Sequence, residues 1–114
     1  MIDKEKLSGR VTCKGYVEGR TRIINSYEDL ESVQKGDVII TSQTDMNYVP
    51  FLLGCGGLIT ERGGRYSHAA IFSRENDLTC ITNVENAREI LTGIDSIVLD
   101  ANRNEIYEVR NGSD

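Results

Sequence analysis

The segment Gly-Gly-Arg-Tyr-Ser-His-Ala-Ala at residues 63–70 constrains the fold more than any other stretch of the 114-residue chain. Its paired glycines, Gly63 and Gly64, allow the backbone to turn sharply and to approach a ligand closely. Ser67 is a favoured N-cap residue and precedes a run of small and apolar side chains. The segment therefore predicts a tight turn and then a helix over residues 69–74, with His68 in its first turn. An apolar run at residues 56–60 predicts a strand that leads into the turn.

His68 is the only histidine of the chain. The first turn of a helix has unpaired amides and the positive end of the helix dipole, which favour a nearby anion and the neutral form of an imidazole. A neutral imidazole is a nucleophile for which a phosphoryl group is a natural electrophile, and Arg65 can pair with phosphoryl oxygens. A lone histidine is more often a surface residue or a satisfied core residue. The glycine pair and the arginine favour the nucleophile here, because packing alone explains neither.

The stretch GGRYSHAAIFSRE at residues 63–75 is similar to the phosphohistidine signature of the phosphoenolpyruvate-utilising enzymes. This family includes phosphoenolpyruvate synthase, pyruvate phosphate dikinase and enzyme I of the sugar phosphotransferase system. Its signature reads Gly-Gly-Arg-Thr-Ser-His-Ala-Ala, followed by an apolar helix that ends in Ala-Arg-Glu. Residues 36–64 also resemble the family, and the glycines at positions 9, 15 and 19 keep the spacing of its opening strand. The resemblance therefore spans residues 9–109.

The resemblance implies a single compact α/β domain with the swivelling β/β/α fold of phosphohistidine domains. This domain is expected over residues 1–110, with residues 111–114 as a frayed tail. The sequence departs from the family at Tyr66, where the family has a threonine that is a regulatory phosphorylation site in plant dikinases. It departs again at Cys13 and Lys14, and at residues 77–81, which replace Gly-Ile-Pro-Ala-Val. That regulation is therefore not carried over to Tyr66.

The resemblance implies that His68 is the catalytic residue and carries the phosphoryl group. Supporting residues are predicted from the signature and from the start of a helix that follows a strand, where ligands of open α/β sheets bind. They are Gly63, Gly64, Arg65 and Ser67 from the first, and Thr44 and Asn47 from the second. It is equally open that Thr44, Asp45 and Asn47 only cap their helix. Glu61 and Arg62 are expected to be solvated.

Periodicity and turn signals predict the remaining elements. In chain order they are bent strands over 10–24, a helix at 26–36, a buried strand at 37–41, a helix from about 47 to 53, a strand at 78–82, a helix at 83–91 and a closing hairpin of 96–99 and 105–109. Ser26 and Asp29 form a capping pattern for the first helix, and Asn83 is predicted to cap the last. Because strands and helices interleave, the fold class is α/β.

Composition excludes several classes of function. The net charge of -5 argues against a nucleic-acid surface, which needs a basic patch. Residues 1–6 lack the apolar core of a signal peptide, and the longest apolar stretch, 49–59, is too short to span a membrane. The three cysteines, Cys13, Cys55 and Cys80, are widely spaced and are interpreted as small core residues in a reducing cytoplasm. No metal site is predicted.

These features together predict the phosphocarrier domain of a phosphotransferase. His68 would accept a phosphoryl group from an ATP- or phosphoenolpyruvate-binding partner domain and pass it to pyruvate or another acceptor. The sequence has no nucleotide-binding loop, so the implied partners are an ATP-grasp nucleotide-binding domain and a pyruvate-type acceptor domain, in cis or in trans. Magnesium and ATP or phosphoenolpyruvate are expected on those partners. Three alternatives stay open: a non-catalytic binding or regulatory module, a structural subunit in which His68 is a turn residue, and the carrier domain of an antibiotic or polysaccharide dikinase.

Overall fold

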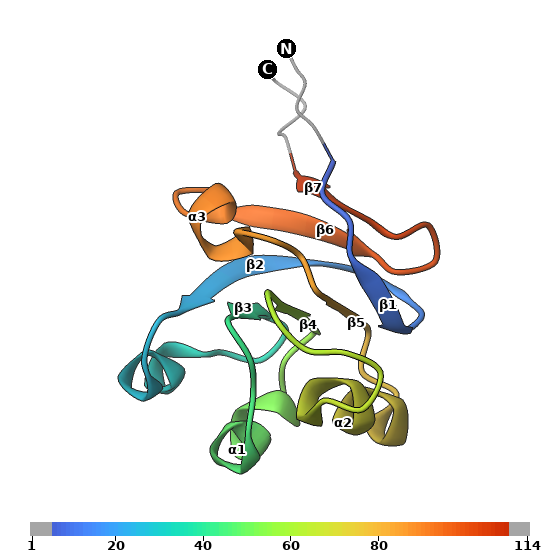
Figure 1. Cartoon of the computed structure of the whole chain (residues 1–114). Coiled ribbons are helices and arrows are strands. Elements are labelled where there is room, and N and C mark those ends of the chain that lie inside the picture. The colour runs from blue at the N-terminus through green and yellow to red at the C-terminus, as the bar shows by residue number, and fades with distance from the viewer. Residues whose placement is uncertain (1–5, 110–114) are drawn as a thin grey trace.

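The computed structural model describes residues 6–109, which form one seven-stranded mixed sheet with helices on both faces (Figure 1). The strands are β1 (Arg10–Cys13), β2 (Tyr16–Ile24), β3 (Val38–Thr41), β4 (Gly57–Thr60), β5 (Cys80–Thr82), β6 (Ser96–Asp100) and β7 (Glu105–Glu108). The helices are η1 (Tyr27–Ser32) and η2 (Met46–Tyr48), which are 3-10 helices, and α1 (Val49–Leu52), α2 (His68–Asn76) and α3 (Ala87–Leu91). The interleaved order is the α/β organisation that the sequence predicts.

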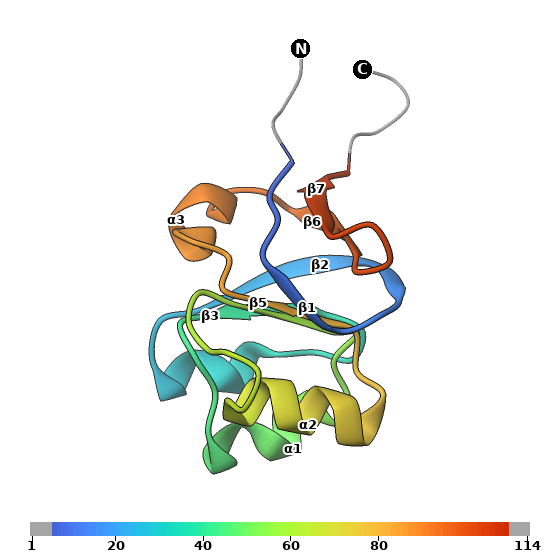
Figure 2. The ribbon, with the colours of Figure 1, turned by 45° about the vertical axis from the view of Figure 1, so that its right-hand side comes forward.

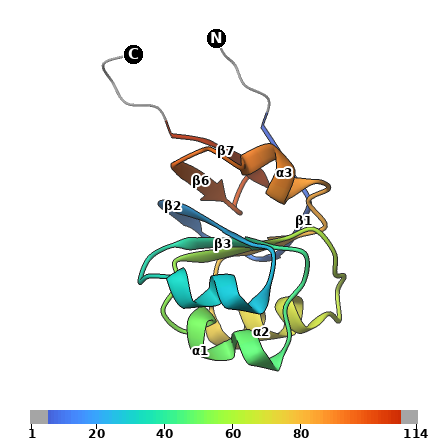
Figure 3. The ribbon, with the colours of Figure 1, turned by 90° about the vertical axis from the view of Figure 1, so that its left-hand side faces the viewer.

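The strand order is β1-β5-β4-β3-β2-β6-β7. β2, β3, β4 and β5 run parallel to one another, whereas β1, β6 and β7 are antiparallel to their neighbours. In Figures 2 and 3, α1 and α2 lie below the parallel strands, and α3 lies above the sheet near β6 and β7. The carboxyl ends of the parallel strands therefore meet at one edge, where the loops into α1 and α2 begin.

β2 joins the parallel strands of the sheet to the antiparallel strands β6 and β7. Its first part, residues 16–20, pairs with β6, and its second part, residues 21–24, pairs with β3. A Cβ on Gly19 would lie 2.5 Å from the carbonyl oxygen of Gly36, so only glycine allows this approach. The predicted break at Gly15 is confirmed, because this residue has φ +151° and separates β1 from β2. The other predicted interruption, at Gly19, is wrong, because β2 continues through this residue.

Two hydrophobic cores lie on opposite faces of the sheet. β3 contributes Val38 and Ile40 to the core that faces α3 and the β6–β7 hairpin, and Ile39 to the core that faces α1 and α2. β4 divides in the same way between Ile59 and Leu58. Successive strand side chains point to opposite faces. Continuous apolar runs are therefore buried on both sides, as expected for central parallel strands.

A buried ion pair fixes the turn before β3. The carboxylate of Asp37, whose side chain is 3% exposed, accepts a hydrogen bond from Arg22 Nε at 2.8 Å. The same carboxylate oxygen accepts the backbone N–H of Gln34 at 2.9 Å. Asp37 therefore ties β2 to the turn that leads into the neighbouring strand.

The three cysteines are free thiols within or against one core. Cys80 is fully buried in the core between the sheet and helices α1 and α2, and Cys13 and Cys55 pack against this core. Burial raises the pKa of the Cys55 thiol to about 12 and that of the Cys80 thiol to about 11. Burial, together with the nearby Asp77 carboxylate, also raises the pKa of Cys13. These thiols are thus held in the protonated, weakly nucleophilic form, which agrees with their interpretation as core residues.

Several local predictions are confirmed. Ser26 and Asp29 form the predicted capping box, although the helix that follows is 3-10 and ends at Ser32. Asp45 caps η2, and Pro50 lies in the first turn of α1. The hairpin of β6 and β7 closes around residues 101–104. No helix within residues 6–109 is long and apolar enough to cross a membrane.

The prediction for residues 83–91 is wrong at its start. Asn83 does not cap a helix; it has a left-handed backbone conformation with φ 61°. A second left-handed residue, Asn86, precedes α3, which begins only at Ala87. The two left-handed asparagines interrupt the run, and asparagine tolerates this conformation better than most residues do. The predicted tail at 111–114 lies outside the described residues.

Candidate functional site

His68 is the first residue of α2, so it lies in the first helical turn, as predicted. Ser67 is its N-cap, as predicted, and its hydroxyl accepts the backbone N–H of Ala70 at 3.2 Å. α2 follows the carboxyl end of β4 through residues 61–67, here termed the histidine loop. The loop after β3, which holds Thr44, leaves the same edge of the sheet. The parallel topology therefore brings two segments together that are more than twenty residues apart in sequence.

The imidazole of His68 is half-buried and held from two sides. Its Nδ1 lies 2.7 Å from the hydroxyl of Thr44, which is 8% exposed. The ring of Phe72, one helical turn later, stacks against it with centroids 6.0 Å apart and an interplanar angle of 25°. Within residues 6–109, Nε2 has no hydrogen-bond partner. The ring is thus oriented through Nδ1, which leaves Nε2 open for chemistry.

This arrangement has a consequence for the tautomer. A neutral imidazole has one N–H donor and one nitrogen lone pair. If Nδ1–H donates to the Thr44 oxygen, the lone pair is on Nε2. The threonine hydroxyl is a competent acceptor, so the contact is compatible with a nucleophilic Nε2.

The carboxylate of Asp45, the residue after Thr44, is held by two hydrogen bonds. The hydroxyl of Tyr27 donates a short hydrogen bond to Asp45, and the backbone N–H of Asn47 donates another at 2.9 Å. These bonds, Tyr27 first, and the charge of His68 hold the pKa of Asp45 below its usual value. Conversely, the bond to Asp45 raises the pKa of Tyr27. Asp45 is therefore held in its ionised form beside Thr44.

Side chains hold three successive carbonyls of the histidine loop. The donors are the Asn83 amide to Gly63 at 2.7 Å, the Ser67 hydroxyl to Gly64 at 3.0 Å, and the Arg74 guanidinium to Arg65 at 2.6 Å. The N–H of a trans peptide points opposite to its carbonyl, and residues 6–109 contain no cis peptide bond. The N–H groups of residues 64–66 therefore point away from these donors, and none has an acceptor in the described chain. Such free amides suit an anion.

The two glycines of the loop differ in what the backbone requires. Gly63 has φ +133°, and a Cβ there would lie 2.9 Å from the Ser67 hydroxyl oxygen. Gly64 has no positive φ, and a Cβ there would meet nothing within 4 Å. Only Gly63 is therefore required by the turn and by the close approach to the helix cap.

Of the predicted supporting residues, Thr44 contacts the His68 ring directly and Ser67 caps its helix. The side chain of Arg65 is exposed and forms no hydrogen bond or ion pair with another residue in the range 6–109. Asn47 is also exposed, and its backbone N–H donates a hydrogen bond to the carboxylate of Asp45. Contact of Arg65 and Asn47 with a phosphoryl group stays a prediction. Sequence reasoning missed Phe72, which its i+4 spacing from His68 could have revealed.

A family model described as "PEP-utilising enzyme, mobile domain" matches residues 33–104, more than half of the chain. The chain belongs to this family. Among its relatives, the mobile domain is 37% identical over 94 residues to a probable phosphoenolpyruvate synthase of Methanothermobacter thermautotrophicus, covering 82% of this chain and 14% of that protein. It is also 37% identical over 90 residues to a rifampicin phosphotransferase of Bacillus cereus, covering 79% of this chain and 10% of that protein. It thus spans only a small part of such relatives.

Solved structures agree on the fold. The mobile domain superimposes on Thermococcus kodakaraensis aconitase X with a TM-score of 0.66 and 12% identity, covering 94% of this chain and all of that chain. It matches a solution structure of Enzyme I (nEIt) with a TM-score of 0.60 and 18% identity, covering 79% of this chain and 36% of that chain. At these identities the likeness concerns the fold alone. The predicted α/β swivelling fold is confirmed.

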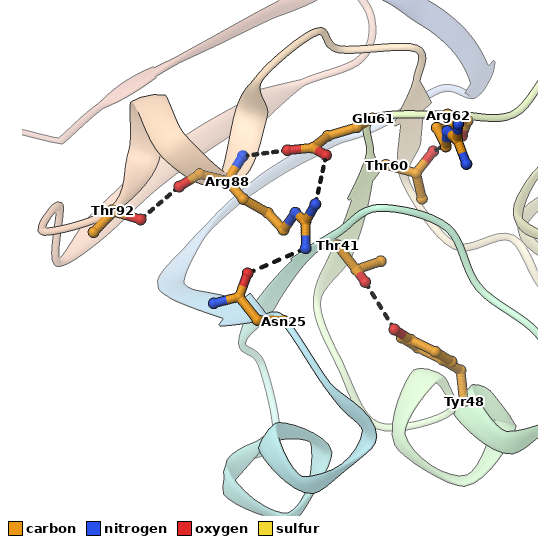
Figure 4. Close-up of polar contacts among 8 residues, drawn as sticks. All are labelled: Asn25, Thr41, Tyr48, Thr60, Glu61, Arg62, Arg88 and Thr92. Carbon is orange, nitrogen blue, oxygen red and sulfur yellow. Dashed lines mark hydrogen bonds and ion pairs between the residues drawn. The ribbon is translucent and has the colours of Figure 1, made fainter.

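An ion pair anchors the start of the histidine loop to α3 (Figure 4). The carboxylate of Glu61 accepts the backbone N–H of Arg88 at 2.8 Å and lies 3.1 Å from its guanidinium. The guanidinium also donates to Asn25 at 3.1 Å. The expectation that Glu61 is solvated is therefore wrong, because its side chain is only 16% exposed. Asn86 offers no side-chain cap to α3, and Glu61 supplies an acceptor from a distant segment.

Glu61→Gln is expected to lower the free energy of unfolding of the mobile domain by about 1–2 kcal/mol at neutral pH. Burial alone would raise the pKa of Glu61, but its hydrogen bonds to Arg88 outweigh burial and lower it below the ordinary 4.5. The stabilisation is thus complete above about pH 4.5 and is lost as the pH falls through the lowered folded-state pKa. Urea unfolding between pH 3 and 7 measures this. Glu85→Gln, at an exposed carboxylate, is the control, and equal losses for both variants would refute the prediction.

Proposed function

We propose that this mobile domain is a phosphocarrier in which Nε2 of His68 accepts a phosphoryl group and passes it on. One observation carries the proposal: Nδ1 is held by Thr44 at 2.7 Å, while Nε2 has no partner within residues 6–109. His68 also begins α2, next to free loop amides. A nucleophile with one nitrogen fixed and the other open, beside anion-binding groups, suits phosphoryl transfer.

The proposed step is an in-line displacement. The Nε2 lone pair forms a bond to phosphorus while the bond from phosphorus to the donor's leaving oxygen breaks, and that oxygen keeps the bonding electrons. The proton on Nδ1 stays hydrogen-bonded to Thr44, and the ring gains positive charge. The carboxylate of Asp45 partly offsets this positive charge, and the N–H groups of residues 64–66 can donate hydrogen bonds to the phosphoryl oxygens. In the second step, an acceptor oxygen forms a bond to the same phosphorus while the bond from phosphorus to Nε2 breaks, and Nε2 regains its lone pair.

Six residues are proposed to support the phosphoryl group. Thr44 orients the ring, Ser67 holds the helix start, and Gly63 shapes the turn. The N–H of Gly64 is proposed to face the phosphoryl group, and Arg65 and Asn47 offer exposed polar groups. Arg65 lies three residues before His68, and its guanidinium is not engaged by any described residue. It can therefore turn to the phosphoryl oxygens without breaking another ion pair.

The partners are proposed to be an ATP-grasp nucleotide-binding domain and a pyruvate-type acceptor domain, in cis or in trans. This rests on the family and on the 10–14% share of the first two relatives that the chain spans. Magnesium and ATP or phosphoenolpyruvate are placed on those partners. Residues 6–109 bring no three His, Cys, Asp or Glu side chains together as a metal site, and no step is routed through a metal held by this chain. The free thiols favour a reducing cytoplasm.

The acceptor has a second candidate. One relative is a rifampicin phosphotransferase, similar in identity to the phosphoenolpyruvate synthase relative. An antibiotic hydroxyl group is therefore an alternative to pyruvate as the acceptor. Either acceptor would receive its phosphoryl group from phosphorylated His68. The test of phosphoryl uptake by His68 therefore does not depend on which acceptor is used.

The test incubates the chain with an ATP-grasp partner domain and magnesium, and with ATP labelled at both its β and γ phosphates. A parallel reaction uses labelled phosphoenolpyruvate and an acceptor domain. The chain is expected to take up one label that is labile in acid and stable in alkali, and that 31P NMR assigns to Nε2. His68→Ala is the blank and should take up none. A chain that stays unlabelled with both donors is a binding or regulatory module, and the proposal is then wrong.

A further inference from the structure

Asn83 reaches from the end of β5 to the histidine loop. Its amide nitrogen donates to the carbonyl of Gly63 at 2.7 Å, across twenty residues of sequence. Its amide oxygen accepts the hydroxyl of Thr82 at 2.9 Å. A carbonyl only accepts, so the nitrogen must face Gly63, which leaves the oxygen for the threonine hydroxyl. The hydrogen bonds therefore run in one direction, with Thr82 donating to Asn83 and Asn83 donating to Gly63.

We infer that Asn83 is a positioning residue for phosphoryl transfer at His68. This inference rests on the proposed phosphocarrier function. The bond from Asn83 fixes the Gly63 carbonyl, and Gly63 in turn packs against the Ser67 hydroxyl, where a Cβ would lie 2.9 Å away. Ser67 caps the helix whose first residue is His68. Direct contacts thus run from Asn83 to the residue that precedes the nucleophile.

The same bond also orients the loop amides. Because the Gly63 carbonyl points to Asn83, the N–H of Gly64 points the opposite way. The neighbouring carbonyls are held by side chains that belong to α2 or its cap, Arg74 and Ser67. Of the three donors to the carbonyls of residues 63–65, Asn83 is the one from outside this helix. The start of the loop is held by the Glu61 and Arg62 N–H groups, so Asn83 fixes its middle at Gly63.

The fold itself depends little on the Asn83 side chain, which is exposed. The connection after β5 is held by Val84, which is buried and donates its backbone N–H to Thr60 at 3.0 Å. Glycine accepts the left-handed conformation of residue 83 without strain. Asn83→Gly therefore removes the amide and keeps the backbone, so it separates positioning from folding.

Asn86→Gly is the matched control. Asn86 has nearly the same backbone conformation, φ 60° against 61°, and lies three residues later. Its side chain caps no helix and forms no hydrogen bond within residues 6–109. Both variants make the same chemical change and the same change in unfolded-chain entropy, but only one releases the histidine loop.

The experiment uses the full 114-residue chain and phosphoramidate, a small donor that needs no partner protein. Nε2 forms a bond to phosphorus as the bond from phosphorus to nitrogen breaks, and the nitrogen leaves as ammonia after taking a proton from water. Single-turnover rates are measured against donor concentration, and 15N-edited NMR follows the amides of residues 64–66. For Asn83→Gly, the maximal rate constant is expected to fall by about tenfold or more. The amide signals should also broaden or shift, while thermal unfolding matches that of Asn86→Gly.

The outcomes separate the two hypotheses. If the wild-type chain takes up phosphoryl at His68 but Asn83→Gly and Asn86→Gly have equal rates and spectra, the positioning role is wrong and the carrier stands. If Asn83→Gly loses its folded spectrum where Asn86→Gly keeps it, Asn83 is a structural residue, which also overturns the inference. If the wild-type chain takes up no phosphoryl from phosphoramidate or from the partner domains, the proposed function itself fails.

Discussion

Thr44→Val chains are expected to take up phosphoryl groups on His68 about 10- to 100-fold more slowly than the wild type, because the partner of the second ring nitrogen fixes tautomer and orientation. The hydroxyl of Thr44 is the hydrogen-bond partner of Nδ1 at 2.7 Å. Valine keeps the shape of threonine and removes that hydroxyl. The ring then keeps only its stacking on Phe72, which does not select a tautomer. Initial rates of label uptake from the ATP-grasp partner measure the effect.

Two further variants decide whether this effect is specific. Thr44→Ser keeps a hydroxyl and is expected to recover most of the rate. Thr41→Val removes another buried hydroxyl of the same strand-to-loop segment, one that pairs with Tyr48 at 2.7 Å and not with His68. If Thr41→Val slows uptake as much as Thr44→Val does, the bond to Nδ1 has no special role.

Asp37→Ala is expected to destabilise the domain by about 3–5 kcal/mol, the range for removing one partner of a buried ion pair. The Asp37 side chain is 3% exposed and the Arg22 side chain is 24% exposed. Without the carboxylate, the guanidinium of Arg22 loses its charged partner, and the backbone N–H of Gln34 loses its acceptor. The midpoint and slope of urea unfolding measure the loss.

An exposed ion pair provides the comparison for Asp37. Lys6 and Glu105 are 3.4 Å apart with side chains 53% and 29% exposed. Lys6→Gln is therefore expected to cost less than about 1 kcal/mol. The double variant Arg22→Leu with Asp37→Leu should be more stable than Asp37→Ala, because no charge is left unpaired. An Asp37→Ala loss no larger than that of Lys6→Gln would contradict this account.

Local signals in the sequence predicted most of the elements. The runs predicted as strands at 37–41 and 56–60 contain β3 and β4, each of which begins one residue later, because strands buried on both faces carry near-continuous apolar residues. The Ser26–Asp29 pattern is a capping box, and Ser67 caps α2. These signals act within a few residues of chain, so they can be read without knowing the fold.

The errors arise where a distant segment competes with a local preference. Asn83 is a good N-cap residue, but its amide bonds Gly63, and the backbone takes the left-handed conformation instead. Glu61 has the charge of a surface residue, yet α3 brings Arg88 to it. Gly63 and Arg88 are both at least twenty residues away from these partners in sequence, so no local pattern predicts either contact.

The α/β class, the single histidine at a helix start and the glycine turn before it can be predicted locally, because periodicity, capping and backbone freedom are properties of neighbouring residues. The strand order, the bond from Thr44 to Nδ1 and the bond from Asn83 to the loop become visible only once the chain is folded. Those depend on which strands pair in parallel, and pairing is chosen by the burial of two whole faces of the sheet. Hence His68 is identifiable from sequence, whereas Thr44 and Asn83 come from loops after β3 and β5, which only the folded sheet makes neighbours of the histidine loop.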